Sequence, residues 1–305
     1  MRVHAEHRPT WKNAKHAAQW LTTLEAHAFP HFGDVSVADV TGPMVRDALA
    51  EIWLTLPETA RRVRQRIGAV LDWAHAKGYR TSEAPRAMLT AGRGLPRQPK
   101  NRGHFAALGW KAVPKFLLDL DATPHAGEGT KLAVRFLILT AARSGEVRGA
   151  RWSEIDLDAR VWSIPGERMK AGRSHAVPLS DAAVAVLQRG TALRTSDDAD
   201  ALIFPGERRG QPMSDMTLTM ALRRMKADCT AHGFRSSFRD WAAEATNFPR
   251  EVAEAALAHV LADKVEAAYR RSDLLEKRRK MMDAWAGFCV GGNGKVVPKA
   301  RNSRA

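Results

Sequence analysis

The chain has 305 residues, enough for about two domains of typical size. Its residues are 45% hydrophobic and 27% charged, and no apolar run approaches the ~18 residues of a membrane span. The N-terminus also lacks the apolar core of a secretory signal. Only two cysteines occur, Cys229 and Cys289, and neither has a metal-like partner spacing. These features argue against a disulfide framework and a structural zinc site, and we expect a cytoplasmic protein.

Charge is the most informative part of the composition. The net charge is +15, the pI is about 10.4, and 34 Arg stand against 14 Lys. A positive field of this size favours a polyanionic partner, and arginine grips phosphate with two parallel hydrogen bonds. A GC-rich genome that encodes Arg in place of Lys is the alternative explanation. A basic membrane-surface protein fits less well, because no Lys-rich amphipathic segment with Trp or Phe stands out.

Residues 12–86 show helical periodicity of apolar residues. Helices are expected over 15–28, from a start at Thr41-Gly42-Pro43 to about Trp53, and over 58–77, where Gly78 ends the pattern. The third helix carries four arginines that could contact a DNA backbone: Arg61, Arg62, Arg64 and Arg66. Their spacing fits a solvated helix face equally well, so both interpretations stay open.

Residues 88–104 are rich in Gly, Pro and basic side chains and predict a flexible linker that could itself track DNA. We therefore expect a helical domain over 1–87, a second domain over 105–289, and a disordered basic tail over 290–305. In the second domain, helices are expected over 110–120 and 129–140. Strands are expected around 161–164 and 175–179, with a further short strand at 202–204. The predicted fold class is mainly α with a small antiparallel β-sheet (α+β).

Four segments of the second domain carry candidate chemistry: residues 140–152, 170–180, 232–241 and 257–271. They supply, in order, an arginine, a hairpin lysine, His-x-x-Arg, a later histidine and a tyrosine. The residues are Arg143, Lys170, His232, Arg235, His259 and Tyr269. This ordered set resembles the signature of the tyrosine recombinases, the phage integrase family. The similarity spans about residues 12–288 and is strongest to the subgroup carried by satellite prophages and genomic islands.

The resemblance implies a helical core-binding domain and a catalytic domain that close as a clamp around duplex DNA. Arg143 and Arg235 would neutralise the nonbridging oxygens of the scissile phosphate, where negative charge grows during attack. Tyr269 would be the nucleophile and form a 3′-phosphotyrosine, which conserves the bond energy for rejoining. Lys170 would protonate the departing 5′ oxygen, and His232 would be the acid–base group near the tyrosine. His259 would donate a hydrogen bond to the phosphate.

The same resemblance implies no metal, nucleotide or other cofactor. The partners would be double-stranded DNA with attachment sites, three further copies of the chain in a homotetramer, and accessory DNA-bending or excision-directing proteins. The protein would act near the nucleoid, and the reaction would integrate or excise a mobile element. Two alternatives remain: a type IB topoisomerase-like strand transferase, and a catalytically silent DNA-binding remnant of an integrase.

Single residues of this set have plainer explanations. Arg143 could simply pair with Glu146, and either histidine could be structural. Lys170 has rivals for proton donation in Lys131 and in Arg173, which is also a candidate DNA contact. Three tryptophans are expected in the core rather than stacked on DNA: Trp152, Trp162 and Trp241. Tyr79, the other tyrosine, is expected to be a packing residue.

Three further features bear on the resemblance. Ala258 stands where much of the wider family has glycine. The chain starts about ten residues before the first core-binding helix, so we expect it to lack the arm-binding domain of full-length relatives. The amphipathic segment 273–288 could pack in its own subunit or dock on a neighbour.

Overall fold

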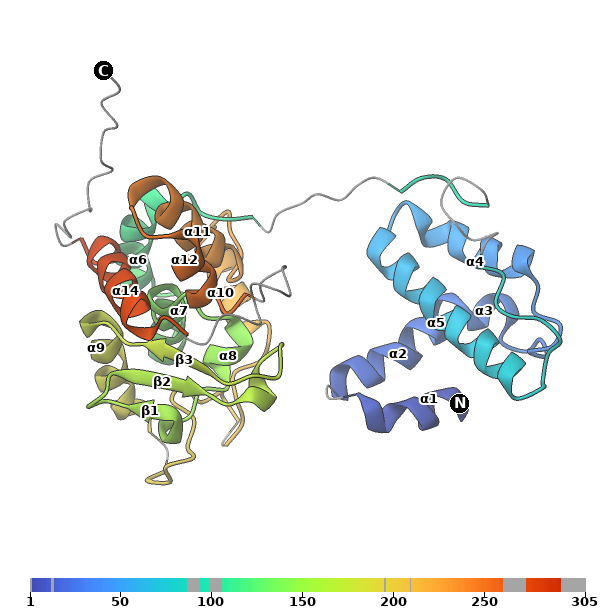
Figure 1. Ribbon diagram of the computed structural model, residues 1–305, viewed down its shortest axis with the longest axis horizontal. Helices are drawn as coiled ribbons and strands as arrows, with labels where there is room; N and C mark the ends of the chain where they lie inside the picture. Colours follow the sequence, from blue (N-terminus) through green and yellow to red (C-terminus); the bar gives the residue numbers. More distant parts are fainter. Residues whose placement is uncertain are drawn as a thin grey trace, which may run out of the picture. The chain divides into compact units, whose positions relative to one another are not determined.

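The computed structural model describes residues 2–11, 14–86, 94–98, 106–194, 196–208, 210–259 and 273–291. Contacts divide the chain into two compact units, residues 1–102 and 103–305. Both are built mainly from helices, and the second also holds a three-stranded antiparallel sheet (Figure 1). The predicted fold class is therefore confirmed. No helix in the described residues is long and apolar enough to cross a membrane.

The elements in the described part of the first unit are all helices. Its helices are α1 (Arg2–His7), η1 (Arg8–Thr10), α2 (Ala14–His27), α3 (Phe29–Phe32), α4 (Gly42–Trp53) and α5 (Pro57–Ala76). The predicted start at Thr41 is confirmed, because the Thr41 hydroxyl accepts a hydrogen bond from the Met44 amide and Pro43 lies in the first turn. Apolar side chains of α2, α4 and α5 form one core, which includes Leu24, Leu49 and Val63.

Part of the predicted linker belongs to this first unit. Leu95 is only 3% exposed, and the Pro96 carbonyl accepts a hydrogen bond of 2.7 Å from the Trp53 indole. The Gln98 amide donates to the carbonyl of Trp53 at 2.9 Å. Residues 94–98 are thus packed on α4 and α5, contrary to the expectation of a flexible segment. The rest of 88–104 lies outside the described residues.

The second unit surrounds one buried helix. Its elements are η2 (Trp110–Ala112), α6 (Val113–Ala122), α7 (Glu128–Thr140), α8 (Ser144–Arg148), η3 (Trp152–Glu154), β1 (Ile155–Asp156), β2 (Val161–Ile164), η4 (Gly166–Arg168), β3 (His175–Pro178), α9 (Asp181–Gly190), η5 (Thr191–Leu193), α10 (Thr217–Arg224), α11 (Gly233–Ala245), α12 (Arg250–Ala256) and α14 (Leu275–Cys289). Every residue of α7 from Leu132 to Thr140 except Arg135 is buried. A helix that is apolar on all sides belongs in the core, which explains its central place.

The sheet has the strand order β1-β2-β3, and Val161 pairs with Pro178 while Ile164 pairs with His175. The two predicted strands are confirmed, and β1 was missed because it has only two residues. The strand expected at 202–204 is wrong: Leu202 forms only an isolated bridge to Arg151. The segment is buried by packing rather than by a sheet, so its apolar run resembled a strand.

Helix α14 packs within its own subunit. Trp285 is fully buried, and its indole donates a 2.8 Å hydrogen bond to the Ile138 carbonyl at the end of α7. Trp241 and Trp162 are buried as predicted, whereas Trp152 is only partly buried against the core. The tail beyond residue 291 lies outside the described residues.

Candidate active site

Arg143 lies where α7 ends and α8 begins. Ala141 closes α7 in the left-handed conformation, with φ 49°, and Arg143 is the residue from which α8 starts. Glu146, whose side chain is 5% exposed, accepts hydrogen bonds from Nη1 of Arg143 at 2.6 Å and from its backbone amide at 2.7 Å. The possible ion pair is therefore real. The pair orients the guanidinium, so that Nη2 faces the Leu257 and Ala258 carbonyls at 3.5 and 3.4 Å.

Arg235 lies in the first turn of α11 and is only 4% exposed. Its Nη1 donates to the Ala141 carbonyl at 2.6 Å, and its Nη2 donates to the Leu257 carbonyl at 2.5 Å. Burial, together with the nearby charge of Arg143, lowers the pKa of Arg235 to about 10, against the opposing effect of Glu146. The two guanidinium groups thus carry two positive charges against the one negative charge of Glu146, so an anion bound at this place would be stabilised.

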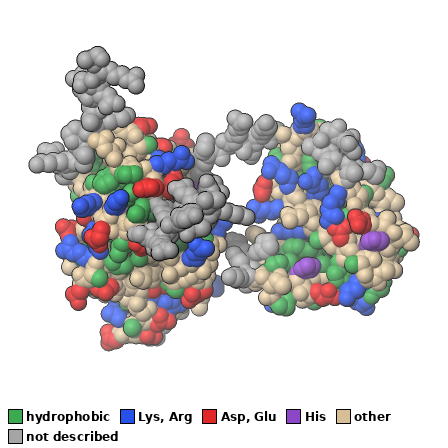
Figure 2. Space-filling model, viewed as in Figure 1, with side chains coloured by type: hydrophobic (Ala, Val, Ile, Leu, Met, Phe, Trp, Pro, Cys, Tyr) green, Lys and Arg blue, Asp and Glu red, His purple; other side chains and the backbone are tan. Residues whose placement is uncertain are grey.

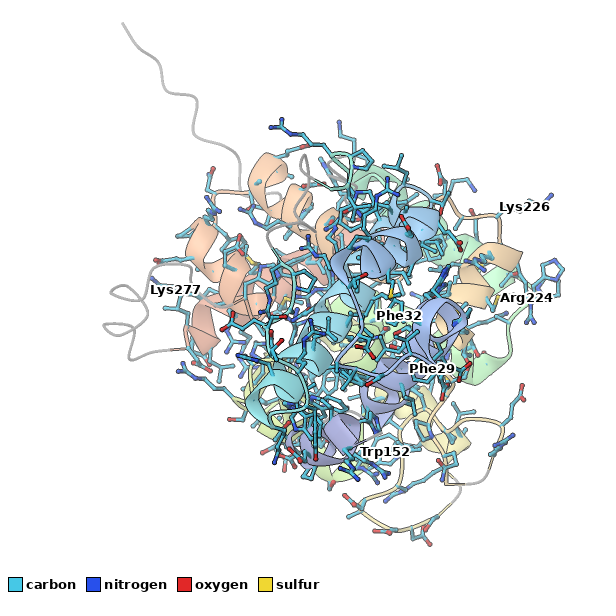
Figure 3. The ribbon with its side chains drawn as sticks, turned by 90° about the vertical axis from the view of Figure 1, so that its right-hand side faces the viewer. Phe29, Phe32, Trp152, Arg224, Lys226 and Lys277 are labelled. Atoms are coloured by element: carbon cyan, nitrogen blue, oxygen red, sulfur yellow. The ribbon has the colours of Figure 1, made fainter. Side chains whose placement is uncertain are left out.

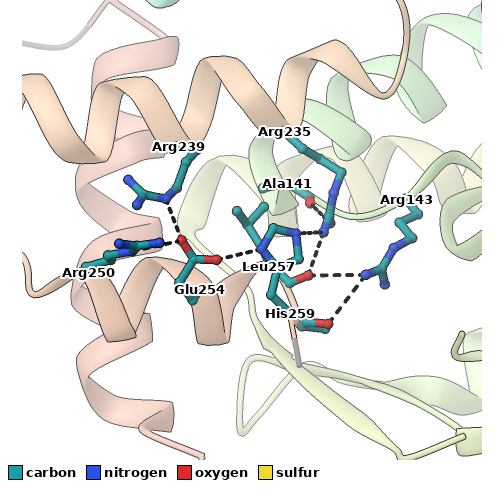
Figure 4. A network of polar contacts seen from close by, with 9 residues as sticks. Ala141, Arg143, Arg235, Arg239, Arg250, Glu254, Leu257 and His259 are labelled. Carbon is teal, nitrogen blue, oxygen red and sulfur yellow. Dashed lines mark hydrogen bonds and ion pairs between the residues drawn. The ribbon is translucent and has the colours of Figure 1, made fainter. Parts of the chain in front are cut away.

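His259 lies two residues after Leu257, whose carbonyl both arginines contact (Figure 4). Ala258 adopts the left-handed conformation, with φ 47°, which glycine enters most easily. The alanine pays about 1 kcal/mol for this conformation. Nε2 of His259 lies 3.3 Å from Nη2 of Arg235, and Nδ1 lies 2.6 Å from Oε2 of Glu254.

His232 occupies the N-cap position of α11, three residues before Arg235. Burial lowers the pKa of His232, and so do the charges of four other candidate residues: Arg235, Arg143, His259 and Lys170. The charges of the four other candidates in the described residues therefore all act on this imidazole. The structure brings them together from four separate stretches of the chain.

Lys170 is exposed in the turn that precedes β3. Its rival Lys131 lies in the first turns of α7, where its amine donates to the Asp121 carbonyl at 2.8 Å. Nine helical residues, or about 14 Å of helix, separate Lys131 from the end of α7 where the site begins. This separation favours Lys170. Arg173, exposed in the same turn, remains a rival.

Of the two tyrosines, Tyr269 lies outside the described residues, and Tyr79 lies within them. Tyr79 is 46% exposed, its hydroxyl accepts a 3.1 Å hydrogen bond from Arg2, and its ring lies near Trp73. This environment fits the expected packing role of Tyr79.

The arginines of α5 do not form one uniform face. Arg61 and Arg62 are exposed and pair with Glu58, whereas Arg64 lies over the Trp53 ring. Arg66 corrects the prediction of a DNA contact. It is only 5% exposed, and its Nη1 donates to the Gln19 carbonyl at 2.8 Å and to the Thr23 hydroxyl. Arg66 therefore joins α5 to α2 within the core.

Sequence reasoning gave no role to two charged residues around His259. Arg239 lies four residues after Arg235 on α11, so the shared helix face was a usable signal. Glu254 has no such signal, since only the fold brings its carboxylate to Arg239 and His259. Other exposed basic residues end α10: Arg224 and Lys226 point outward from the second unit (Figure 3). Basic side chains at this position stabilise the negative C-terminal end of the helix dipole, which is sufficient to explain them.

Within the described residues, no cluster of His, Cys, Asp and Glu could hold a metal ion. The candidate site instead consists of cationic and hydrogen-bond-donating groups around a backbone carbonyl. Such an arrangement can bind an anion and stabilise negative charge.

Comparison with known proteins agrees with this chemistry. Residues 1–91 match the family profile described as Phage integrase central domain, and residues 113–275 match the profile described as Phage integrase family. Prophage integrase IntA of Escherichia coli is 34% identical over 90% of this chain, and the integrase of Enterobacteria phage P4 is 31% identical over 92%. This chain spans 65% and 66% of the length of these two relatives.

Solved structures show the same fold. A lambda integrase dimer bound to a COC′ core site has a TM-score of 0.64 and 19% identity, over 89% of this chain and 93% of that one. A lambda integrase tetramer bound to a Holliday junction also has a TM-score of 0.64, with 16% identity, over 89% of this chain and 76% of that one. Two profiles, long matches to prophage integrases and a shared fold lead to one assignment: the chain belongs to the phage integrase family.

Proposed function

We propose that this chain is a site-specific DNA recombinase that cleaves and rejoins strands of a mobile element at attachment sites. One observation carries the proposal. Arg143 and Arg235, from two separate stretches of the chain, both donate to the Leu257 carbonyl, and Nε2 of His259 lies 3.3 Å from Nη2 of Arg235. A phosphate at this place would receive hydrogen bonds from two guanidinium forks and an imidazole.

The proposed cleavage step follows from the chemistry of these groups. The phenolic oxygen of Tyr269 attacks phosphorus, a phosphotyrosine bond forms at the 3′ end, and the bond to the 5′ oxygen breaks. His232 takes the tyrosine proton, and Lys170 gives a proton to the departing 5′ oxygen. Arg143 and Arg235 neutralise the added negative charge, and rejoining reverses the same steps.

The first unit supports DNA binding in this proposal. Arg61 and Arg62 are exposed on α5 and line a hollow together with Arg86. Lys and Arg side chains gather on the face of this unit drawn in Figure 2. We propose that these side chains contact the phosphate backbone, and that Arg173 does so from the second unit. In the proposed reaction four copies act on two duplexes, with accessory DNA-bending or excision-directing proteins, in the bacterial cytoplasm at the nucleoid.

The test is a duplex with a nick next to the cleavage site, so that the cleaved fragment leaves and the covalent complex accumulates. Candidate attachment sequences come from the direct repeats that flank the mobile element. We expect a covalent protein–DNA adduct with the natural chain and none with Tyr269→Phe. Tyr79→Phe is the matched control, because the chain has only these two tyrosines and this variant should retain the adduct. Binding without any adduct would instead favour a catalytically silent DNA-binding protein.

A further inference from the structure

Each ring nitrogen of His259 has a polar partner (Figure 4). Nδ1 lies 2.6 Å from a carboxylate oxygen of Glu254, and Nε2 lies 3.3 Å from a guanidinium nitrogen of Arg235. A guanidinium can only donate hydrogen bonds, so Nε2 must accept one. The ring proton therefore lies on Nδ1, where the carboxylate of Glu254 accepts it. The two partners together select one tautomer of the neutral ring.

Glu254 is itself held in place. Its second carboxylate oxygen accepts a 2.7 Å hydrogen bond from Nε of Arg239, and Arg250 lies 3.7 Å from the same oxygen. The Glu254 side chain is 19% exposed. Burial alone would raise the pKa of Glu254, but the hydrogen bonds from His259 and Arg239 outweigh burial and lower it. The carboxylate is thus charged and oriented from α11 before any DNA arrives.

We infer that Glu254 is a positioning residue for DNA cleavage, which holds Nε2 of His259 toward the scissile phosphate and stabilises the imidazolium that donates to it. This inference rests on the proposed function. When a phosphate accepts the hydrogen bonds of Arg235, Nε2 can bind a phosphate oxygen only if it carries a proton of its own. That proton comes from solvent, while the proton on Nδ1 stays shared with Glu254.

The surroundings of His259 make this carboxylate important. The charged and titratable groups that face the ring and its partner come from α12, α11 and the start of α8: Glu254, Arg250, Arg235, Arg239, His232 and Arg143. Glu254 is the one carboxylate in that set. Without it, the positive charges of the neighbouring arginines would oppose a second proton on the ring.

A structural role is the competing explanation, because the His259 amide also donates to the Glu254 carbonyl at 3.0 Å beyond the end of α12. A double-mutant cycle separates the two roles. The assay is single-turnover adduct formation on the nicked duplex, with Glu254→Ala, His259→Ala and the double variant. Glu128→Gln is the matched control, since its carboxylate also accepts a 2.6 Å hydrogen bond from an arginine, Arg189, but on an exposed surface.

We expect Glu254→Ala to slow adduct formation on the order of 10–100-fold, as other residues that orient a reacting histidine do. The double variant should be no slower than His259→Ala, and the control should match the natural chain. If Glu254→Ala slows adduct formation in the His259→Ala background by the same factor as in the natural chain, Glu254 acts independently of His259. That result would overturn the inference. A normal rate in Glu254→Ala would overturn it as well.

Glu254→Gln keeps the shape and one accepting oxygen, so it serves if the alanine variant unfolds. As pH rises, the rate of adduct formation of this variant should begin to fall at a lower pH than the rate of the natural chain. The reason is that the amide no longer stabilises the imidazolium. An unchanged pH profile would contradict the inference alone. No adduct with the natural chain on any attachment sequence would overturn the proposed function, and the inference with it.

Discussion

Two arginine-rich helices of this chain differ in a way that separates a reactive site from a charged surface. On α5, Arg61 and Arg62 are exposed and share the carboxylate of Glu58. On α11, Arg235 is buried beside a second guanidinium, and its hydrogen bonds end on backbone carbonyls. A buried cation next to another cation costs free energy unless an anion joins them. The spacing of arginines in the sequence shows neither which guanidinium is buried nor that Arg143 and Arg235 both contact the Leu257 carbonyl. The two helices therefore cannot be distinguished from their sequences in this respect.

The largest effect is expected for the buried arginine. Arg235→Lys keeps the charge but removes the planar fork that can hold two phosphate oxygens. We expect adduct formation on the nicked duplex to fall about 10²–10³-fold, the usual loss when one donor to a developing charge is removed. Arg189→Lys is the control, because Arg189 is exposed on α9 and pairs with Glu128, and this variant should cleave normally. Equal rates for Arg235→Lys and the natural chain would contradict the assignment.

The next effect is on stability at the Arg143–Glu146 pair. Glu146→Gln leaves the Arg143 guanidinium partly buried without its carboxylate. We expect the free energy of unfolding to fall by roughly 1–3 kcal/mol. Urea unfolding measures this change, with the exposed pair of Glu58 on α5 as the comparison. Glu58→Gln should cost about 0–1 kcal/mol, and a larger loss at Glu58 than at Glu146 would reverse the expected order.

His175 on β3 gives a pH-dependent prediction. Burial, together with the charge of Arg278, lowers its pKa to about 4. Its folded pKa is below the unfolded value, so the unfolded chain binds the proton first as pH falls. Stability is then lost between about pH 6.5 and pH 4 and is retained above that window. When the pH is lowered from 7 to 5, the free energy of unfolding, measured in urea, should fall by roughly 2 kcal/mol less for His175→Gln than for the natural chain. Parallel losses in the two proteins would contradict this prediction.

The smallest effect is expected on the exposed face of α5. Arg62→Ala should lower the slope of log affinity against log salt by about 1, with stability unchanged, because one phosphate contact is lost. Arg66→Ala should instead destabilise the first unit, because the Gln19 carbonyl loses its donor. Filter binding across a salt series and thermal unfolding measure the two quantities. A salt-slope change for Arg66→Ala at normal stability would return Arg66 to the DNA-binding set.

These contrasts show what the sequence could predict. The helices and the hairpin follow from periodicity, as in the buried stripe of α5 that includes Val63 and Ile67 and the alternation around Val177. The ordered motif also predicted residues that the fold brings together, since the charges of Arg143 and Lys170 reach His232. Arg66 and Glu254 could not be predicted, because their roles depend on what packs opposite them. The spacing of Arg66 is that of its exposed neighbours, and Glu254 meets Arg239 only through the packing of α12 on α11.

In the proposed reaction, Arg143 and Arg235 act by neutralising the charge of the scissile phosphate. To test this, adduct formation is compared on a normal nicked duplex and on one whose scissile phosphate is a methylphosphonate, which has lost the nonbridging charge. On the normal phosphate, Arg143→Ala and Arg235→Ala should be severely slowed. On the neutral linkage, most of this defect should disappear, because there is no nonbridging charge to neutralise. An equally large defect on both substrates would show that the arginines do not act by neutralising this charge.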